Sequence, residues 1–221
     1  MRDYATVENL GRAAVLSGVV TVMAVGRLTQ GNLPLSAYVP LTFVAMLFVA
    51  GAVTSWGTKA GMPGIVTDRK TCAQGCGIAL ALAAISIAAH RLGAESVIRQ
   101  LLDAPRHEAV LELAFPATFS GRVSLVLWSG GVQVLFLVAA PMAMFARLTG
   151  NRWIAAGLCL GLRAFVVYRQ MADADIEQGI PVFMTGALLQ TGAACFLFAR
   201  YGLIPAMLFA AVSDLHVFLG R

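Results

Sequence analysis

The chain has 221 residues, of which 59% are hydrophobic and 12% are charged, and its mean hydropathy is +0.79. Soluble domains carry about 25% charged residues, so the composition excludes a soluble domain. The net charge of +5 comes from basic residues that are scattered along the chain, with no cluster denser than Arg69-Lys70, which argues against a nucleic-acid partner. The composition predicts an integral membrane protein surrounded by a lipid bilayer.

Seven segments have the composition of membrane-spanning helices, which need roughly 20 mostly apolar residues. They are residues 12–29, 37–56, 71–90, 122–146, 151–168, 179–199 and 202–219. No alternating strand pattern appears, so we predict an all-α fold, a polytopic transmembrane helix bundle of about seven spans. Three spans belong to an N-terminal membrane region, residues 1–121, and four to a membrane core, residues 122–221.

The connection between the third and fourth spans, residues 91–121, is amphipathic. In its first part Val97 and Ile98 are spaced for one helical face, and Glu95 and Arg99 form an i, i+4 pair. Residues 107–113 are amphipathic in the same way. We expect short helices that lie in the membrane interface.

The basic residues indicate a location and an orientation. All but Lys59 and Lys70 are Arg, and Ala and Gly are abundant, which is typical of a high-GC bacterial genome. We therefore expect a multi-pass protein of the bacterial cytoplasmic (inner) membrane. The charges that flank the short loops favour a cytoplasmic N-terminus.

A few polar side chains fall at membrane depth, where ionisable groups are costly and mark functional sites. This predicted intramembrane cluster consists of Gln133, Arg163, Arg169, Asp214 and His216. Asp214 needs a cation, which Arg163 or Arg169 of the fifth span could supply, whereas His216 faces another side of the last span. We expect Gln133, Arg169 and Asp214 inside the bundle. A structural Asp–Arg pair and a catalytic or ion-coupling role both remain open.

Two further patterns involve small residues. Gly157 and Gly161 form a G-x-x-x-G pattern in the fifth span, which predicts internal helix packing, with dimerisation as the alternative.

Cys72 and Cys76 are one helical turn apart and complete no zinc or haem pattern, so we interpret the cysteines as packing residues.

The segment from 122 to 219 resembles the core of the CPBP family, membrane metalloproteases related to the CAAX-processing endopeptidases. That family carries E-E-x-x-x-R, F-x-x-x-H and H-x-x-x-N/D on successive helices. The corresponding segments here are residues 132–137, 165–169 and 210–214. The run from Arg200 to Ala206 is also similar to the family's R-x-G-L-x-x-A approach to its last helix.

The resemblance extends to the spacing of the motifs but not to their reactive residues. Val132 and Gln133 replace the two Glu, and Arg169 and Ala210 replace the two His, while Phe165 and Asp214 match. A zinc site needs deprotonated or neutral donor groups, and a guanidinium repels a cation. We therefore predict no metal ligand, no cofactor and no catalytic residue.

Three functions follow from these observations. The first is a pseudoprotease, a non-catalytic CPBP-like protein that serves as a scaffold: a binding, assembly or structural subunit that contacts another membrane protein. The second is a small-solute transporter or its substrate-binding subunit, which the intramembrane polar cluster supports. The third, a residual enzyme, is disfavoured by the replaced motif residues.

Overall fold

The structure of the protein is a computed structural model that describes residues 7–30, 34–64, 68–102, 112, 115–173, 176 and 179–219. Every element in these ranges is helical. They are α1 (Val7–Gln30), α2 (Leu35–Lys59), α3 (Arg69–Ala89), η2 (His90–Ala94), α4 (Glu95–Leu102), α6 (Phe119–Trp128), η4 (Ser129–Gln133), η5 (Leu135–Ala139), α7 (Ala140–Thr149), α8 (Arg152–Asp173), α9 (Ile180–Tyr201), α10 (Leu203–Ser213) and η7 (Asp214–Phe218).

Six of the helices are long and apolar enough to cross a membrane. α6, η4, η5 and α7 form one of them, a continuous helix of 31 residues, Phe119–Thr149, which we call the central helix. The seventh predicted span is shorter and comprises α10 and η7, Leu203–Phe218. The prediction of an all-α transmembrane bundle is confirmed.

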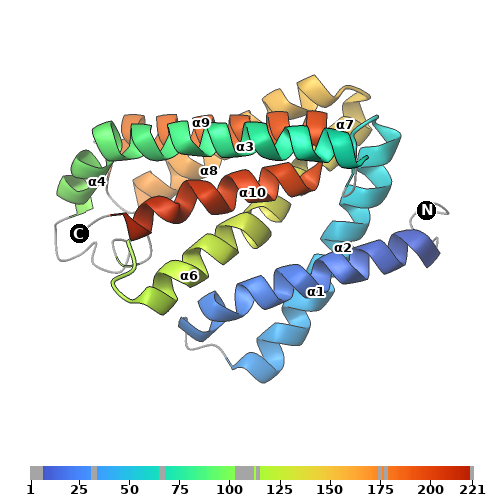
Figure 1. The fold of residues 1–221 in the computed structure, drawn as a ribbon, viewed down its shortest axis with the longest axis horizontal. Helices are drawn as coiled ribbons and strands as arrows, with labels where there is room; N and C mark the ends of the chain where they lie inside the picture. The colour runs from blue at the N-terminus through green and yellow to red at the C-terminus, as the bar shows by residue number, and fades with distance from the viewer. Residues whose placement is uncertain are drawn as a thin grey trace.

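One hydrophobic core joins both halves of the chain. Fully buried side chains come from α1 (Val20), α2 (Val53), the central helix (Leu135), α9 (Phe198) and α10 (Leu203). α10 packs against both α3 and α9, and α1 packs against α2 and α6 (Figure 1). Residues 1–121 and 122–221, which the sequence suggested as two regions, therefore share a single core.

The central helix contains two π-helical segments, η4 and η5. A π-turn closes its hydrogen bonds over five residues, which widens the helix. At η4, glycines allow close contact with neighbours: a Cβ on Gly130 would lie 2.8 Å from Cβ of Ala211, and one on Gly131 would lie 3.1 Å from Sδ of Met23. These contacts bring α1 and α10 against the same turn of the central helix.

Polar contacts join the loops at one end of the bundle. Arg152 donates hydrogen bonds to the carbonyl oxygens of Gly61, at 3.4 Å, and Ala199, at 3.2 Å. The backbone N–H of Leu203 donates to the carbonyl oxygen of Gly64 at 3.1 Å. Since α10 begins at Leu203, the loop after α2 fixes the start of the last span.

The other end of the bundle carries the predicted interfacial segment. η2 and α4 extend α3, and Arg91 pairs with Glu95 at 3.0 Å. Ile98 of α4 is buried with Ile176, and Val182 packs against them, so α4 contacts the loop before α9. Of the predicted helix at 107–113 the structure describes only Glu112, and the side chain of Arg99 lies outside the described residues.

Candidate functional site

Three residues of the predicted intramembrane cluster line one cavity. Gln133 of the central helix, Arg163 of α8 and Asp214 of η7 surround a space of about 50 Å³. Its other polar lining residues are Ser129, Gln190, Thr191 and Ser213. In an otherwise apolar bundle, four helical segments therefore place polar groups around a single point.

A larger cavity adjoins this space at Gln133, Leu137 and Arg163, which line both. Its volume is about 450 Å³, and it lies between the central helix and α8. Ligand sites commonly have volumes of about 300–1,000 Å³, so the larger cavity has room for a small molecule. The remaining lining residues are Trp128, Val132, Phe136, Val166 and Gln170.

The guanidinium of Arg163 is mostly buried where these two cavities meet. Among the residues that the structure describes, it makes no ion pair or hydrogen bond, and its electrostatic neighbour is the thiol of Cys159. A buried charge without a counter-ion is costly. Arg163 therefore presents to the cavities a positive charge that has no ion-pair partner among the described residues, although Asp214 lines the smaller cavity with it.

Asp214 lies at the same site but has other electrostatic neighbours. Its carboxylate interacts with Arg27 of α1 and with His216, and the hydroxyl of Ser129 is within hydrogen-bonding reach. That hydroxyl also lies 3.3 Å from the carbonyl oxygen of Ala210. The basic side chains whose charges act on Asp214 are thus His216 and Arg27, and neither Arg163 nor Arg169 takes the role that we predicted for the fifth span.

The prediction that Arg169 lies inside the bundle is wrong. Its side chain is 59% exposed and pairs with Asp173 at 3.2 Å. Six helical residues turn through about 600°, or roughly 240° beyond a full rotation, so Arg169 and Arg163 cannot share a face. Arg163 is the basic residue of α8 that faces the cavities.

The predicted internal packing of Gly157 and Gly161 is also wrong. Both lie on the exposed side of α8, and a Cβ on either would meet nothing within 4 Å. The glycines with close neighbours are elsewhere: a Cβ on Gly75 of α3 would lie 2.5 Å from Cβ of Tyr201. The dimerisation alternative for the G-x-x-x-G pattern stays a prediction.

The ring of His216, besides its electrostatic interaction with Asp214, packs against other rings. Its ring centroid lies 4.0 Å from that of His90 and 6.3 Å from that of Phe115. Its Nδ1 lies 3.0 Å from the carbonyl oxygen of Ser213. His216 therefore joins the end of the last helix to the segment after α3 rather than to the cavities.

Sequence reasoning missed Arg27, Gln190 and Thr191. Arg27 lies near the end of α1, where it resembled a charge that flanks a span. Gln190 lies in the middle of α9, a span with no charged residue before Arg200. The argument that selected Gln133 would have selected Gln190 as well, because an amide at that depth also needs a polar neighbour.

The positions that resemble the CPBP motif do not form a metal site in the structure. Val132, at a position of the family's glutamates, is 5% exposed, and Phe165, one of the two matching residues, is 62% exposed on the outer side of α8. In the part of the chain that the structure describes, no group of three His, Cys, Asp or Glu could hold a metal ion.

No protein-family model, curated protein or solved structure matches this chain.

Proposed function

We propose that the chain is a non-catalytic, CPBP-like protein of a bacterial inner membrane that binds a small anionic solute, as a transporter or the substrate-binding subunit of one. The observation that carries this proposal is the uncompensated guanidinium of Arg163 between two cavities at membrane depth. A solute carboxylate or phosphate would supply the missing counter-ion, and Arg is well suited to bind either group through two hydrogen bonds.

The other lining residues support a solute that is polar at one end and apolar at the other. Gln133, Gln190 and Thr191 offer neutral donors and acceptors around the guanidinium. Trp128 and Phe136 line the larger cavity and offer apolar surface. Small-molecule sites usually consist of a mainly apolar cavity that contains a few polar groups.

Arg163→Leu tests whether the charge serves binding or folding. If the guanidinium awaits a ligand, replacing it with an apolar group removes an uncompensated charge and raises the melting temperature of the ligand-free protein in detergent. A clear fall in the melting temperature of Arg163→Leu would instead indicate a structural role and would contradict the proposal.

Binding itself is measured with a panel of small mono- and dicarboxylates and inorganic phosphate. A bound anion stabilises the folded state, by about 2.7 kcal/mol at a concentration one hundred times its Kd. We expect one class of anion to raise the melting temperature of the natural protein and of Arg169→Gln but not of Arg163→Gln. Equal responses in all three proteins, or none, would count against the site. Uptake into proteoliposomes then separates a transporter from a binding subunit.

A scaffold for another membrane protein is the second candidate, supported by the outer side of α8. Gly157 and Gly161 are open there, and Leu158 and Leu162 beside them are exposed. Small residues let a second helix approach closely in a membrane. A stoichiometric partner that copurifies in mild detergent and is lost in Gly157→Leu would favour this function. Gly77→Leu on α3, also without a neighbour within 4 Å, is the matched control.

A further inference from the structure

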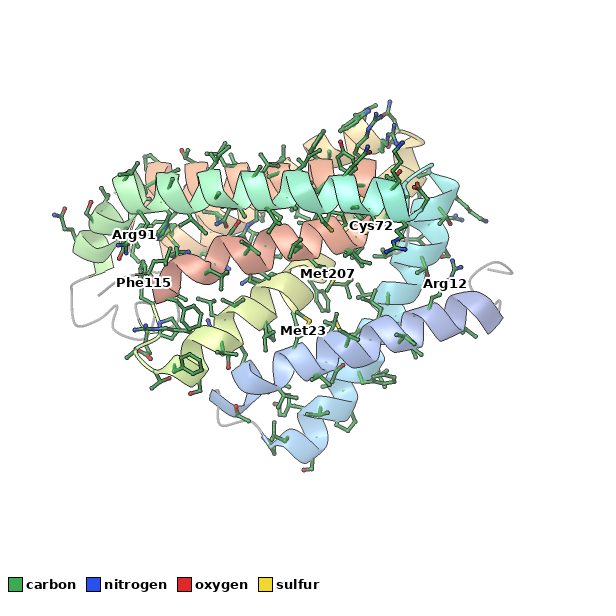
Figure 2. All side chains as sticks on the ribbon, viewed as in Figure 1. Arg12, Met23, Cys72, Arg91, Phe115 and Met207 are labelled. Carbon is green, nitrogen blue, oxygen red and sulfur yellow. The ribbon has the colours of Figure 1, made fainter. Side chains whose placement is uncertain are left out.

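An apolar groove runs between α1 and α10, remote from Arg163. Its volume is about 680 Å³. Val15, Val19 and Met23 form one wall, and Met207 and Ala211 form the other. Figure 2 shows Met23 and Met207 facing each other between the two helices.

The central helix closes the inner end of this groove. A Cβ on Gly131 would lie 3.1 Å from Sδ of Met23, and one on Gly130 would lie 2.8 Å from Cβ of Ala211 and 3.2 Å from the carbonyl oxygen of Met207. The groove therefore runs along two spans, and its open side faces the surroundings of the bundle, where Val15 is 70% exposed and Val19 is 51% exposed.

The length of the groove matches one leaflet of a bilayer. Its lining on α1 extends from Gly11 to Met23, which at about 1.5 Å per residue is roughly 18 Å. Half of the hydrocarbon core is about 15 Å thick. A straight acyl chain that enters at the Gly11 end would reach the middle of the bilayer where the groove ends.

A positive charge lies at the entrance of the groove. Arg12 is an exposed lining residue one helical turn before Val15, at the end of α1 where the apolar span begins (Figure 2). Arg side chains bind phosphate oxygens through charge-assisted hydrogen bonds, and basic residues at the membrane surface attract anionic lipids. The entrance thus suits a negatively charged headgroup.

We propose that this groove binds one acyl chain of an anionic glycerophospholipid from the leaflet on the N-terminal side of α1, with the lipid headgroup against Arg12. The apolar walls hold the chain, and the guanidinium selects the headgroup. This site is independent of the solute site, because the two share no lining residue.

The test compares phosphatidylglycerol with phosphatidylcholine of identical acyl chains. The full-length protein in detergent is mixed with each lipid, and native mass spectrometry measures the bound fraction. We expect phosphatidylglycerol to bind about fivefold more tightly, the preference that one basic residue near an anionic lipid confers. In Arg12→Gln this ratio should fall close to one, and in Arg12→Lys it should persist.

Matched variants separate the headgroup from the groove. Val15→Trp places a large side chain in the groove and should weaken both lipids, whereas Val22→Trp, at an α1 position that is 72% exposed and outside the groove, should weaken neither. Arg200→Gln, at an exposed position on α9, should leave the lipid ratio unchanged. No preference for phosphatidylglycerol, a preference that survives in Arg12→Gln, or equal effects of the two Trp variants would overturn the proposal.

Discussion

The imidazole rings of His90 and His216 lie with their centroids 4.0 Å apart and their planes tilted by 46°. His90 begins η2 at the end of α3, and His216 lies in η7 at the end of the last span. Phe115, just before the central helix, contacts both rings, at 6.0 and 6.3 Å between centroids. Three segments that are distant in sequence thus meet in one ring cluster.

Replacement of His216 measures how much this ring cluster contributes to the stability of the folded protein. His216→Ala removes two ring contacts and should lower the free energy of unfolding by about 0.5–1.5 kcal/mol beyond the loss of buried area. His216→Phe keeps a ring at this position and should retain most of the stability. Melting temperatures in detergent provide the comparison. If the Phe variant is as unstable as the Ala variant, the hydrogen-bonding nitrogen and not the ring is responsible.

Asp214 and Arg27 should behave as a coupled pair. Asp214→Ala leaves Arg27 without one of its acidic neighbours, another being Glu112. We expect a loss of about 1–3 kcal/mol, less than for a fully buried pair, because Arg27 is only partly buried. Arg27→Leu in the Asp214→Ala background should recover much of this loss.

Arg169→Leu is the control for that double variant. Arg169 pairs with Asp173 at an exposed site, so its removal should not recover the stability of Asp214→Ala. Rescue by Arg169→Leu instead of Arg27→Leu, measured as melting temperature, would contradict the assignment of the pair.

Close packing of α3 against the end of α9 and the start of α10 depends on Gly75. A Cβ there would lie 2.5 Å from Cβ of Tyr201 and 2.8 Å from Cγ of Pro205. Gly75→Ala should therefore force the helices apart and cost about 1–3 kcal/mol. Gly77→Ala, two residues further along α3 with nothing within 4 Å, should be neutral or slightly stabilising. Equal denaturation midpoints for the two variants would show that the α3–α10 contact is not tight.

The start of α3 should be sensitive to pH through Asp68. Its carboxylate accepts a hydrogen bond from the backbone N–H of Thr71 at 3.0 Å, and the hydrogen bonds from Thr71 lower the pKa of Asp68 below its ordinary value. A lowered pKa in the folded state means that the cap stabilises the protein above the unfolded pKa and is lost as pH falls through the folded pKa.

Three proteins test this cap. Asp68→Ala should lower the melting temperature at pH 7 and lose that difference in strong acid, because the natural residue is protonated there. Asp68→Asn keeps a capping oxygen without titrating, so its stability relative to Asp68→Ala should not change with pH. A difference between the natural protein and Asp68→Ala that stays constant down to strong acid would contradict the role of the charge.

Hydropathy predicted the spans closely because the thickness of the bilayer limits the length of each helix. The expected spans 37–56 and 179–199 became Leu35–Lys59 and Ile180–Tyr201. The burial of individual faces was harder to predict. Lipid tails and neighbouring helices are equally apolar, so the sequence of α8 does not show which side faces the bundle.

The candidate site was predicted in part for the same reason. Gln133, Arg163 and Asp214 were selected because polar groups at membrane depth need neighbours, and they line one cavity. The pairing of Asp214 with Arg27 could not be predicted, because it depends on α1 packing beside the central helix. Arg169 was misplaced because a charge near the end of a helix can reach water.

The π-turns of the central helix make the number of residues between Trp128 and Ala140 important. Each π-turn accommodates one residue more than an α-turn. Both π-turns already hold their extra residue, so inserting one more residue here would rotate α7 by about 100° relative to α6. Met142, Ala143 and Ala146, which are fully buried, would then leave the core together. This stretch should therefore tolerate no insertion, and no larger side chain at Gly130 or Gly131.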